Sequence, residues 1–194
     1  RDDTLAAFKV LRAAGFDNIS LDLMYGFPGQ TRGELEADID ALLALKSEHL
    51  SLYALTVEER SLFFARKEAS AAASPDFYSF ICARLGGAGF GQYEISNFAR
   101  PGMRSAHNLN YWRGGEYVGL GMAAHSHLEG RRFWNADTLP EYLRLMSEKN
   151  DACVGSEELP AREKMVETFL FGLRMNEGVD VYALEKMFGV PLSD

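Results

Sequence analysis

An α/β fold with a parallel sheet or barrel is predicted for most of this chain, and two patterns predict it. Segments in which apolar and polar residues alternate, as they do in strands, recur along the first half of the sequence. Between them lie segments of about 10–15 residues whose apolar positions have helical spacing. Strands that alternate with helices in this way are typical of βαβ units, in which the strands are parallel.

Local signals define the first units. A first helix is expected to stop at Gly15, and the residues after it alternate as a strand. Thr31 and Glu34 have the spacing of a capping box, which predicts that a helix begins there. Right-handed crossovers would place the helices on one side of neighbouring parallel strands. The predicted strands are 17–25, 49–55 and 92–96, and the predicted helices are 32–46 and 75–86.

The second half is less regular. A fourth strand is expected over 118–126 beside a short strand at 132–134, and the alanine- and serine-rich stretch 69–74 is expected to be a surface loop. After about Asp137 the pattern becomes helical. The predicted helices are 139–149, 161–175 and 180–188, with Gly178 and Gly189 as stop signals.

Composition excludes several classes of protein. The chain is 47% hydrophobic and 25% charged, which is ordinary for a soluble globular protein, and its net charge of −8 argues against nonspecific nucleic-acid binding. No run approaches the roughly 18 apolar residues of a transmembrane helix. Cys82 and Cys153 have no CxxC spacing, which argues against a disulfide framework and suits a reducing cytoplasm. Because the chain runs from Arg1 to Asp194 without a starting Met, we expect it to be a fragment of a longer one.

Asp22 lies in the middle of an otherwise apolar strand. Strand alternation puts it on one face with Ser20 and Met24, and puts Leu21 and Leu23 on the other. A buried carboxylate is costly unless it is paired, so one interpretation is a structural Asp that caps a loop or pairs with an arginine. The other is a carboxylate in a barrel lumen, near the strand ends where barrel ligands bind.

Three of the four histidines have local interpretations of their own. His125 and His127 are two positions apart on one strand face and could bind a metal if a third ligand came from elsewhere. A barrel metal hydrolase built on this pair is therefore one hypothesis, although two histidines alone are a weak signal. His49 begins a strand and is interpreted as a hydrogen-bonded structural histidine.

The most informative block of the chain is residues 107–112, His-Asn-Leu-Asn-Tyr-Trp. It combines an imidazole, amides, a phenol and an indole, and we expect it to be an irregular segment. Sites for flat aromatic ligands often combine such groups, because rings supply contact area and polar atoms fix orientation. Haem iron takes an imidazole ligand, which His107 could supply. The alternative is a loop histidine that hydrogen-bonds to backbone.

Five segments in matching order and spacing resemble the HemW family, the haem chaperones of the radical S-adenosylmethionine (SAM) superfamily. The segments are NISLDLMYGFPGQT at 18–31, HLSLY at 49–53, YEISNFA at 93–99, HNLNYW at 107–112 and GLGMAAHS at 119–126. The resemblance covers the chain from about Arg1 to Asp194, and the 107–112 block favours the HemW branch over the related oxidase. It implies the C-terminal part of a partial (β/α)6 TIM-like radical SAM barrel over residues 1–136, followed by a small, truncated helical domain over 137–194.

The same resemblance implies three ligands and the residues that bind them. SAM would contact Asp22 and Met24, with His125 near the end of a sixth barrel strand as a neighbour of that pocket. Haem would contact Asn108, Tyr111 and Trp112, with His107 as the iron ligand. The [4Fe–4S] cluster would be held outside this chain, because the family's CxxxCxxC motif does not occur in it.

The function implied is a cytoplasmic haem chaperone that binds haem and transfers it to apo-proteins. The resemblance leaves open whether the molecule forms homodimers and whether it performs radical chemistry. An oxygen-independent coproporphyrinogen-III oxidase, which decarboxylates propionate side chains through a SAM-derived radical, is the first alternative. The metal hydrolase that uses His125 and His127 is the second.

Overall fold

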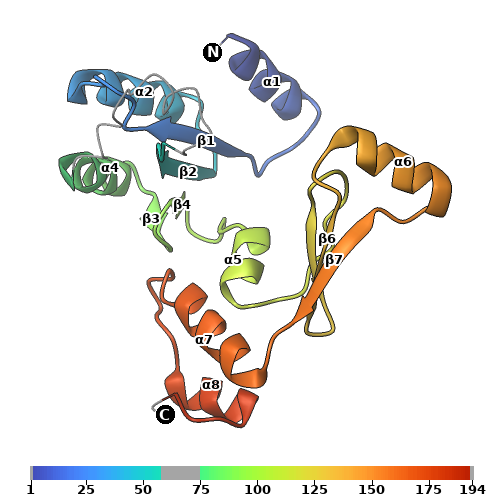
Figure 1. The fold of residues 1–194 in the computed structure, drawn as a ribbon. Helices are drawn as coiled ribbons and strands as arrows, with labels where there is room; N and C mark the ends of the chain where they lie inside the picture. Colours follow the sequence, from blue (N-terminus) through green and yellow to red (C-terminus); the bar gives the residue numbers. More distant parts are fainter. Residues whose placement is uncertain (1, 58–74, 193–194) are drawn as a thin grey trace. The chain divides into compact units, whose positions relative to one another are not determined.

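The computed structural model describes residues 2–57 and 75–192, so the predicted loop at 69–74 lies outside the described residues (Figure 1). The chain divides into two compact units, residues 1–105 and 106–194. Residues 136 and 137, where we expected one domain to end and the next to begin, lie inside the second unit between two paired strands. The domain boundary of the whole protein stays a prediction.

The first unit is an α/β layer whose sheet has four strands in the order β1-β2-β4-β3. β1 and β2 are parallel, with Ser20 opposite His49 and Tyr25 opposite Ala54, which confirms the first predicted pair of strands. The elements of this unit are α1 (Asp2–Ala13), β1 (Ser20–Tyr25), α2 (Arg32–Ala44), β2 (His49–Ala54), α4 (Pro75–Gly87), β3 (Gly91–Gln92) and β4 (Asn97–Ala99).

The predicted third parallel strand at 92–96 is wrong. The chain makes a tight hairpin there, in which β3 pairs antiparallel with β4, and the Tyr93 amide donates to the Asn97 carbonyl at 3.2 Å. β4 then returns antiparallel along β2, with Ser51 opposite Asn97. The reversal therefore replaces one long strand by two short ones and ends the run of parallel neighbours.

The start of α2, which the capping box predicts, is confirmed. Thr31 is the N-cap of α2, where the Glu34 amide donates to Thr31 Oγ1 at 3.3 Å and the Thr31 amide donates to Glu34 Oε2 at 2.8 Å. These reciprocal bonds satisfy two amides that the helix itself cannot pair. The N-terminal helix α1 ends shortly before Gly15, whose φ of +92° is a conformation that glycine adopts without steric cost.

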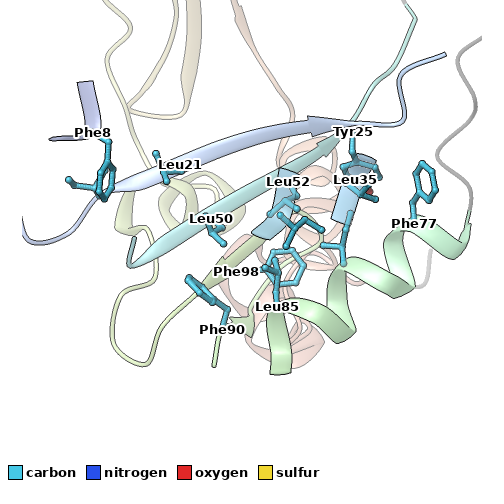
Figure 2. Packing of buried hydrophobic residues seen from close by; sticks show 13 residues of the cluster. Phe8, Leu21, Tyr25, Leu35, Leu50, Leu52, Phe77, Leu85, Phe90 and Phe98 are labelled. Carbon is cyan, nitrogen blue, oxygen red and sulfur yellow. The ribbon is translucent and has the colours of Figure 1, made fainter. Parts of the chain in front are cut away.

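One face of the sheet forms the core of the first unit. Leu21 of β1, Leu50 and Leu52 of β2, and Phe98 of β4 pack against α2 and α4, and Figure 2 shows these side chains gathered in one cluster. Because α2 and α4 both contribute to this cluster, they lie on the same side of the sheet, as expected. Leu21 and Leu23 pack toward the helices, whereas Ser20, Asp22 and Met24 are exposed on the opposite face, which confirms the predicted alternation.

The second unit contains an antiparallel sheet in the order β5-β6-β7 and, within its described residues, four helices. Helix α6 has the bounds that the sequence predicts, and Gly189 ends α8 with a φ of +68°. The elements are α5 (Ala106–Trp112), β5 (His125–Leu128), β6 (Arg131–Asn135), α6 (Leu139–Lys149), β7 (Cys153–Glu158), α7 (Ala161–Gly172) and α8 (Val181–Phe188).

Three predictions for this unit are corrected. The expected strand at 118–126 is a loop until His125, and β5 pairs antiparallel with β6, so His125 does not end a parallel barrel strand. The region after Asp137 is not purely helical, because β7 adds a third strand to β6. The block 107–112 is a regular helix, α5, because it holds no helix breaker before Gly114 and Gly115. Among the described residues, no helix is long and apolar enough to cross a membrane.

Candidate functional site

The face of the first sheet that turns away from the core is lined by polar side chains. Strand register places Asp22 of β1, Ser51 of β2 and Asn97 of β4 in one row across three strands. A second row pairs Ser20 with His49. Polar side chains on a sheet face that is simply exposed to solvent would be accessible. Here Ser51, Asn97 and His49 are almost fully buried.

His49 is held at both ring nitrogens. Ser20 Oγ lies 2.7 Å from Nδ1, and the Tyr93 hydroxyl lies 2.8 Å from Nε2. The residue is only 2% exposed, and this burial lowers the pKa of the imidazole, although the nearby Asp22 carboxylate opposes the effect. His49 is therefore a hydrogen-bonded structural histidine, as the sequence predicts.

We predict that unit 1 loses stability through His49 as the pH falls. An unfolded histidine titrates near pH 6.5, and the pKa of folded His49 is lower, so the unfolded state takes up the proton first. The stabilising contribution is complete above about pH 6.5 and is lost as the pH falls toward the folded pKa. In urea titrations, wild type should exceed His49→Gln in free energy of unfolding at pH 7.5, by a margin that shrinks toward pH 5. A margin independent of pH would contradict this.

Two buried polar groups in the segment 94–97 were not anticipated from the sequence. Asn97 Oδ1 is buried and has no donor among the described residues. Glu94 is completely buried, and its carboxylate accepts from the Ser96 amide at 2.8 Å. A buried acceptor without a donor is rare in folded proteins and often marks a place that a ligand or water completes. The sequence signals for this face were the polar residues at alternate positions of β1 and β2.

The polar face has groups that fit SAM. Asp22 presents an exposed carboxylate that could accept from the ammonium or hydroxyl groups of SAM, and Asn97 offers the unpaired buried amide oxygen. Met24 and Tyr53, opposite each other on β1 and β2, provide exposed apolar surface beside them. The residues present do not fit a [4Fe–4S] cluster, because the whole chain has two cysteines and the cluster needs closely set thiolates.

The second unit holds a pocket of about 610 Å³ whose lining comes from 106–194 alone. Its floor is one face of the three-stranded sheet, where His127, Arg132 and Glu157 lie in one cross-strand row. Its walls come from helices α5, α7 and α8, and include Tyr111, Trp112, Lys164, Phe171 and Phe188. The volume is within the range of about 300–1,000 Å³ that is common for small-molecule sites.

The structure divides the proposed haem contacts between the pocket and the surface. Tyr111 and Trp112 line the pocket, whereas His107 is exposed on the preceding turn of α5 and Asn108 is half-buried. The His107 and Tyr111 rings meet edge to face, with centroids 4.8 Å apart, because the two residues are one helical turn apart. His107 thus lies on an accessible surface with Tyr111 beside it, and its role as an iron ligand stays a prediction.

Trp112 packs against Phe171 of α7 and against Arg174, which follows that helix. Its ring lies 6.4 Å from that of Phe171, and the Arg174 guanidinium stands 4.3 Å above it. The indole Nε1 is buried and has no acceptor among the described residues. The pocket wall formed by Trp112 is therefore packed from behind, and it has one hydrogen-bond donor that no described residue accepts.

Most of the charge in the pocket is neutralised internally. Arg132 pairs with Glu167 and with Glu157, and its hydrogen bond to Glu167 is the main reason that the pKa of this guanidinium is raised. Lys164 also lines the pocket, and its ammonium makes no ion pair within the described part of the chain. Lys164 and Phe171 had no sequence signal as site residues, since both occupy ordinary helix positions.

The histidine pair on β5 does not assemble a metal centre of the kind that a hydrolase needs. His125 and His127 both line the pocket, but within residues 2–57 and 75–192 no three His, Cys, Asp or Glu side chains are grouped to hold a metal ion. The pair is found with Tyr111 and Trp112 in the second unit, while Asp22 and Met24 belong to the first. The assignment of His125 to SAM stays a prediction.

Two proteins of known name that are similar to this chain are haem chaperones. The chain is 36% identical to the haem chaperone HemW of Bacillus subtilis over 193 residues, which covers 96% of this chain and 51% of that protein. It is 35% identical to HemW of Lactococcus lactis, covering 92% of this chain and 48% of the relative. The chain therefore spans about half the length of the relatives it matches.

Two further matches concern fold and domain. Residues 159–194 match the HemN C-terminal domain family. The structure is similar to that of coproporphyrinogen III oxidase (HemN) from Escherichia coli, a radical SAM enzyme, with a TM-score of 0.79 and 21% identity over 95% of this chain and 46% of that one. This likeness confirms the predicted fold class, a mixed α/β chain that matches part of a radical SAM protein.

Proposed function

Because the chain is a homologue of the HemW haem chaperones over almost all of its length, we propose that the protein binds haem and delivers it to apo-haemoproteins in the cytoplasm. The observation that carries the proposal is helix α5, which exposes the His107 imidazole and turns Tyr111 and Trp112 toward a pocket of about 610 Å³. Imidazole is a common haem iron ligand, and aromatic rings supply the apolar contact that a porphyrin needs. In this proposal His107 ligates the iron, and Asn108, Tyr111 and Trp112 contact the macrocycle.

A transfer experiment tests this function. Full-length protein loaded with ferric haem is mixed with an apo-haemoprotein immobilised on resin, and the two are separated and their absorption spectra compared. Haem should move to the resin faster than it does from haem-loaded serum albumin. Equal rates of haem transfer from this protein and from serum albumin would mean that the protein only releases haem passively, which would contradict a chaperone function. The same preparation should not decarboxylate coproporphyrinogen III, whereas turnover would favour the oxidase alternative.

We further propose that SAM contacts Asp22 and Met24 on the polar face of the first sheet, and that the iron–sulfur cluster is held by thiolates outside this chain. The contact of His125 with SAM stays a separate prediction. When bound, SAM and the cluster would supply the radical chemistry of this superfamily. The exposed Asp22 carboxylate and the unpaired Asn97 Oδ1 support the site, because both can accept hydrogen bonds from a polar cofactor.

Replacing Asp22 by asparagine should weaken SAM binding to full-length protein with a reconstituted cluster about tenfold or more. The reason is the loss of a hydrogen bond to a charged group, which contributes roughly 1.5–3 kcal/mol. Equilibrium dialysis with SAM measures the change. Asp17→Asn removes the same charge from an exposed position just before β1 and should leave SAM binding unchanged. Equal affinities of Asp22→Asn and wild type would remove Asp22 from the cofactor site.

A further inference from the structure

The pocket of the second unit has ligand-binding features that the proposed contacts of His107 and Asn108 do not use. Neither residue lines it, although Tyr111 and Trp112 do. The pocket is mainly apolar, one aromatic wall is Trp112 beside Phe171, and the lining includes two histidines from β5. A flat apolar ligand with a metal at its centre could pack against the aromatic walls and be ligated by an imidazole.

His127 is oriented for metal binding by a hydrogen bond at its other nitrogen. Its Nδ1 lies 3.3 Å from the Gly115 carbonyl oxygen. A carbonyl oxygen can only accept, so Nδ1 carries the proton and the Nε2 lone pair is left for a metal. Paired backbone bonds of 2.9 Å between His127 and Tyr117 fix the strand position itself. Histidines that bind metals usually donate their second nitrogen to a carbonyl or carboxylate in this way.

His125, two positions earlier on the same strand face, is held differently. Its ring stacks on that of Trp134, with centroids 5.8 Å apart and 26° between the planes. Trp134 in turn packs over Gly155, where an added Cβ would clash with the indole. No carbonyl fixes the tautomer of His125 among the described residues. The two histidines therefore share a pocket and a strand face, and only His127 has a preset ligand nitrogen.

The charge in the pocket suits a ligand with carboxylate groups. Arg132 is already paired with Glu157 and Glu167, but the Lys164 ammonium makes no ion pair in the described segments. Lys164 stands beside Gly130, where an added Cβ would lie 2.8 Å from Nζ, so its position at the pocket is close-packed. A porphyrin propionate would give this cation a partner.

We propose that this pocket is a second haem site, in which His127 Nε2 ligates the iron, the macrocycle lies against Trp112 and Phe171, and Lys164 pairs with a propionate. The inference rests on the proposed haem function and adds a site separate from His107. A continuous row of rings connects the two positions. The ring centroid of Tyr111 lies 4.8 Å from that of His107 and 4.5 Å from that of Tyr117. The ring centroids of Tyr117 and His127 are 6.2 Å apart. Haem bound at the surface of α5 would thus be next to a more enclosed position.

The test uses full-length protein and ferric haem in a His107→Ala background, so that the surface ligand is absent. This variant should still bind one equivalent of haem with the sharpened Soret band of imidazole ligation. Adding His127→Ala should remove that band, and free imidazole should restore it. Adding His49→Gln instead is the control, because both ring nitrogens of His49 are already hydrogen-bonded in the first unit, and it should leave the band intact. Binding of iron-free protoporphyrin IX, followed by its fluorescence, should survive in all three variants, which shows that the pocket is still folded.

Three outcomes separate the two proposals. If wild type binds no ligated haem, the proposed function itself fails. If wild type binds haem but His107→Ala shows no ligated band, His107 is the sole ligand and the second site is overturned. If the band persists when His127→Ala is added to His107→Ala, His127 is not the ligand and the inference is likewise overturned.

Discussion

His107→Ala in the full-length protein should remove the imidazole-ligated haem bound at helix α5 and weaken binding at that position at least tenfold. His107 is exposed and lies against the edge of the Tyr111 ring, so its imidazole is both accessible and oriented. No other histidine lies on α5 to replace it. In titrations with ferric haem, the Soret change should saturate at a lower amplitude than in wild type. An unchanged amplitude and affinity would mean that α5 supplies no iron ligand.

The chain provides a matched control for this loss. His49→Gln removes a histidine whose ring nitrogens are both occupied, by Ser20 and Tyr93, and should leave haem binding unchanged. Tyr111→Ala keeps the ligand and removes apolar contact, so it should weaken haem binding by about 1–3 kcal/mol. A loss for Tyr111→Ala with none for His107→Ala would show that α5 contacts the porphyrin without ligating the iron.

Leu50→Ala should destabilise the first unit by about 2–5 kcal/mol, the usual cost of emptying a large buried site. Leu50 is fully buried on the central strand β2, with Leu21 beside it on β1 and Phe98 on β4 (Figure 2). The cavity would open between sheet and helices, where the neighbours belong to paired strands and cannot readily collapse into it. Urea unfolding of the chain measures the change in free energy.

Val10→Ala is the control for Leu50→Ala. Val10 is 67% exposed on α1, so removing its two methyl groups should change the free energy of unfolding by less than about 0.5 kcal/mol. Similar losses for the two variants would mean that the packed face of the first sheet does not dominate the stability of this unit.

The features that could be predicted from the sequence are those that depend on neighbours along the chain. The period-two pattern from Ser20 to Tyr25 determined which face of β1 is buried, because a strand alternates its side chains. The capping box at Thr31 and Glu34 depends on four residues only. The structural assignment of His49 followed from the position of this residue at the start of a strand.

Features that depend on distant partners could not be predicted. The turn between β3 and β4 depends on the space that β2 offers to Asn97 and Phe98, so the segment at 92–96 resembled one long strand. β7 has two adjacent glutamates at its end and little apolar pattern, and it is a strand because β6 pairs with it. The pocket depends on α5, β5 and α7 meeting in space, which explains why Lys164 and Phe171 were missed.

The central claim is that this protein binds haem through imidazole, and titration of full-length wild-type protein with ferric haem tests it most directly. We predict a sharpened, shifted Soret band that saturates, with a low-spin electron paramagnetic resonance signal that His107→Ala and His127→Ala diminish separately and abolish together. A spectrum that stays that of free haem throughout the titration would contradict the claim.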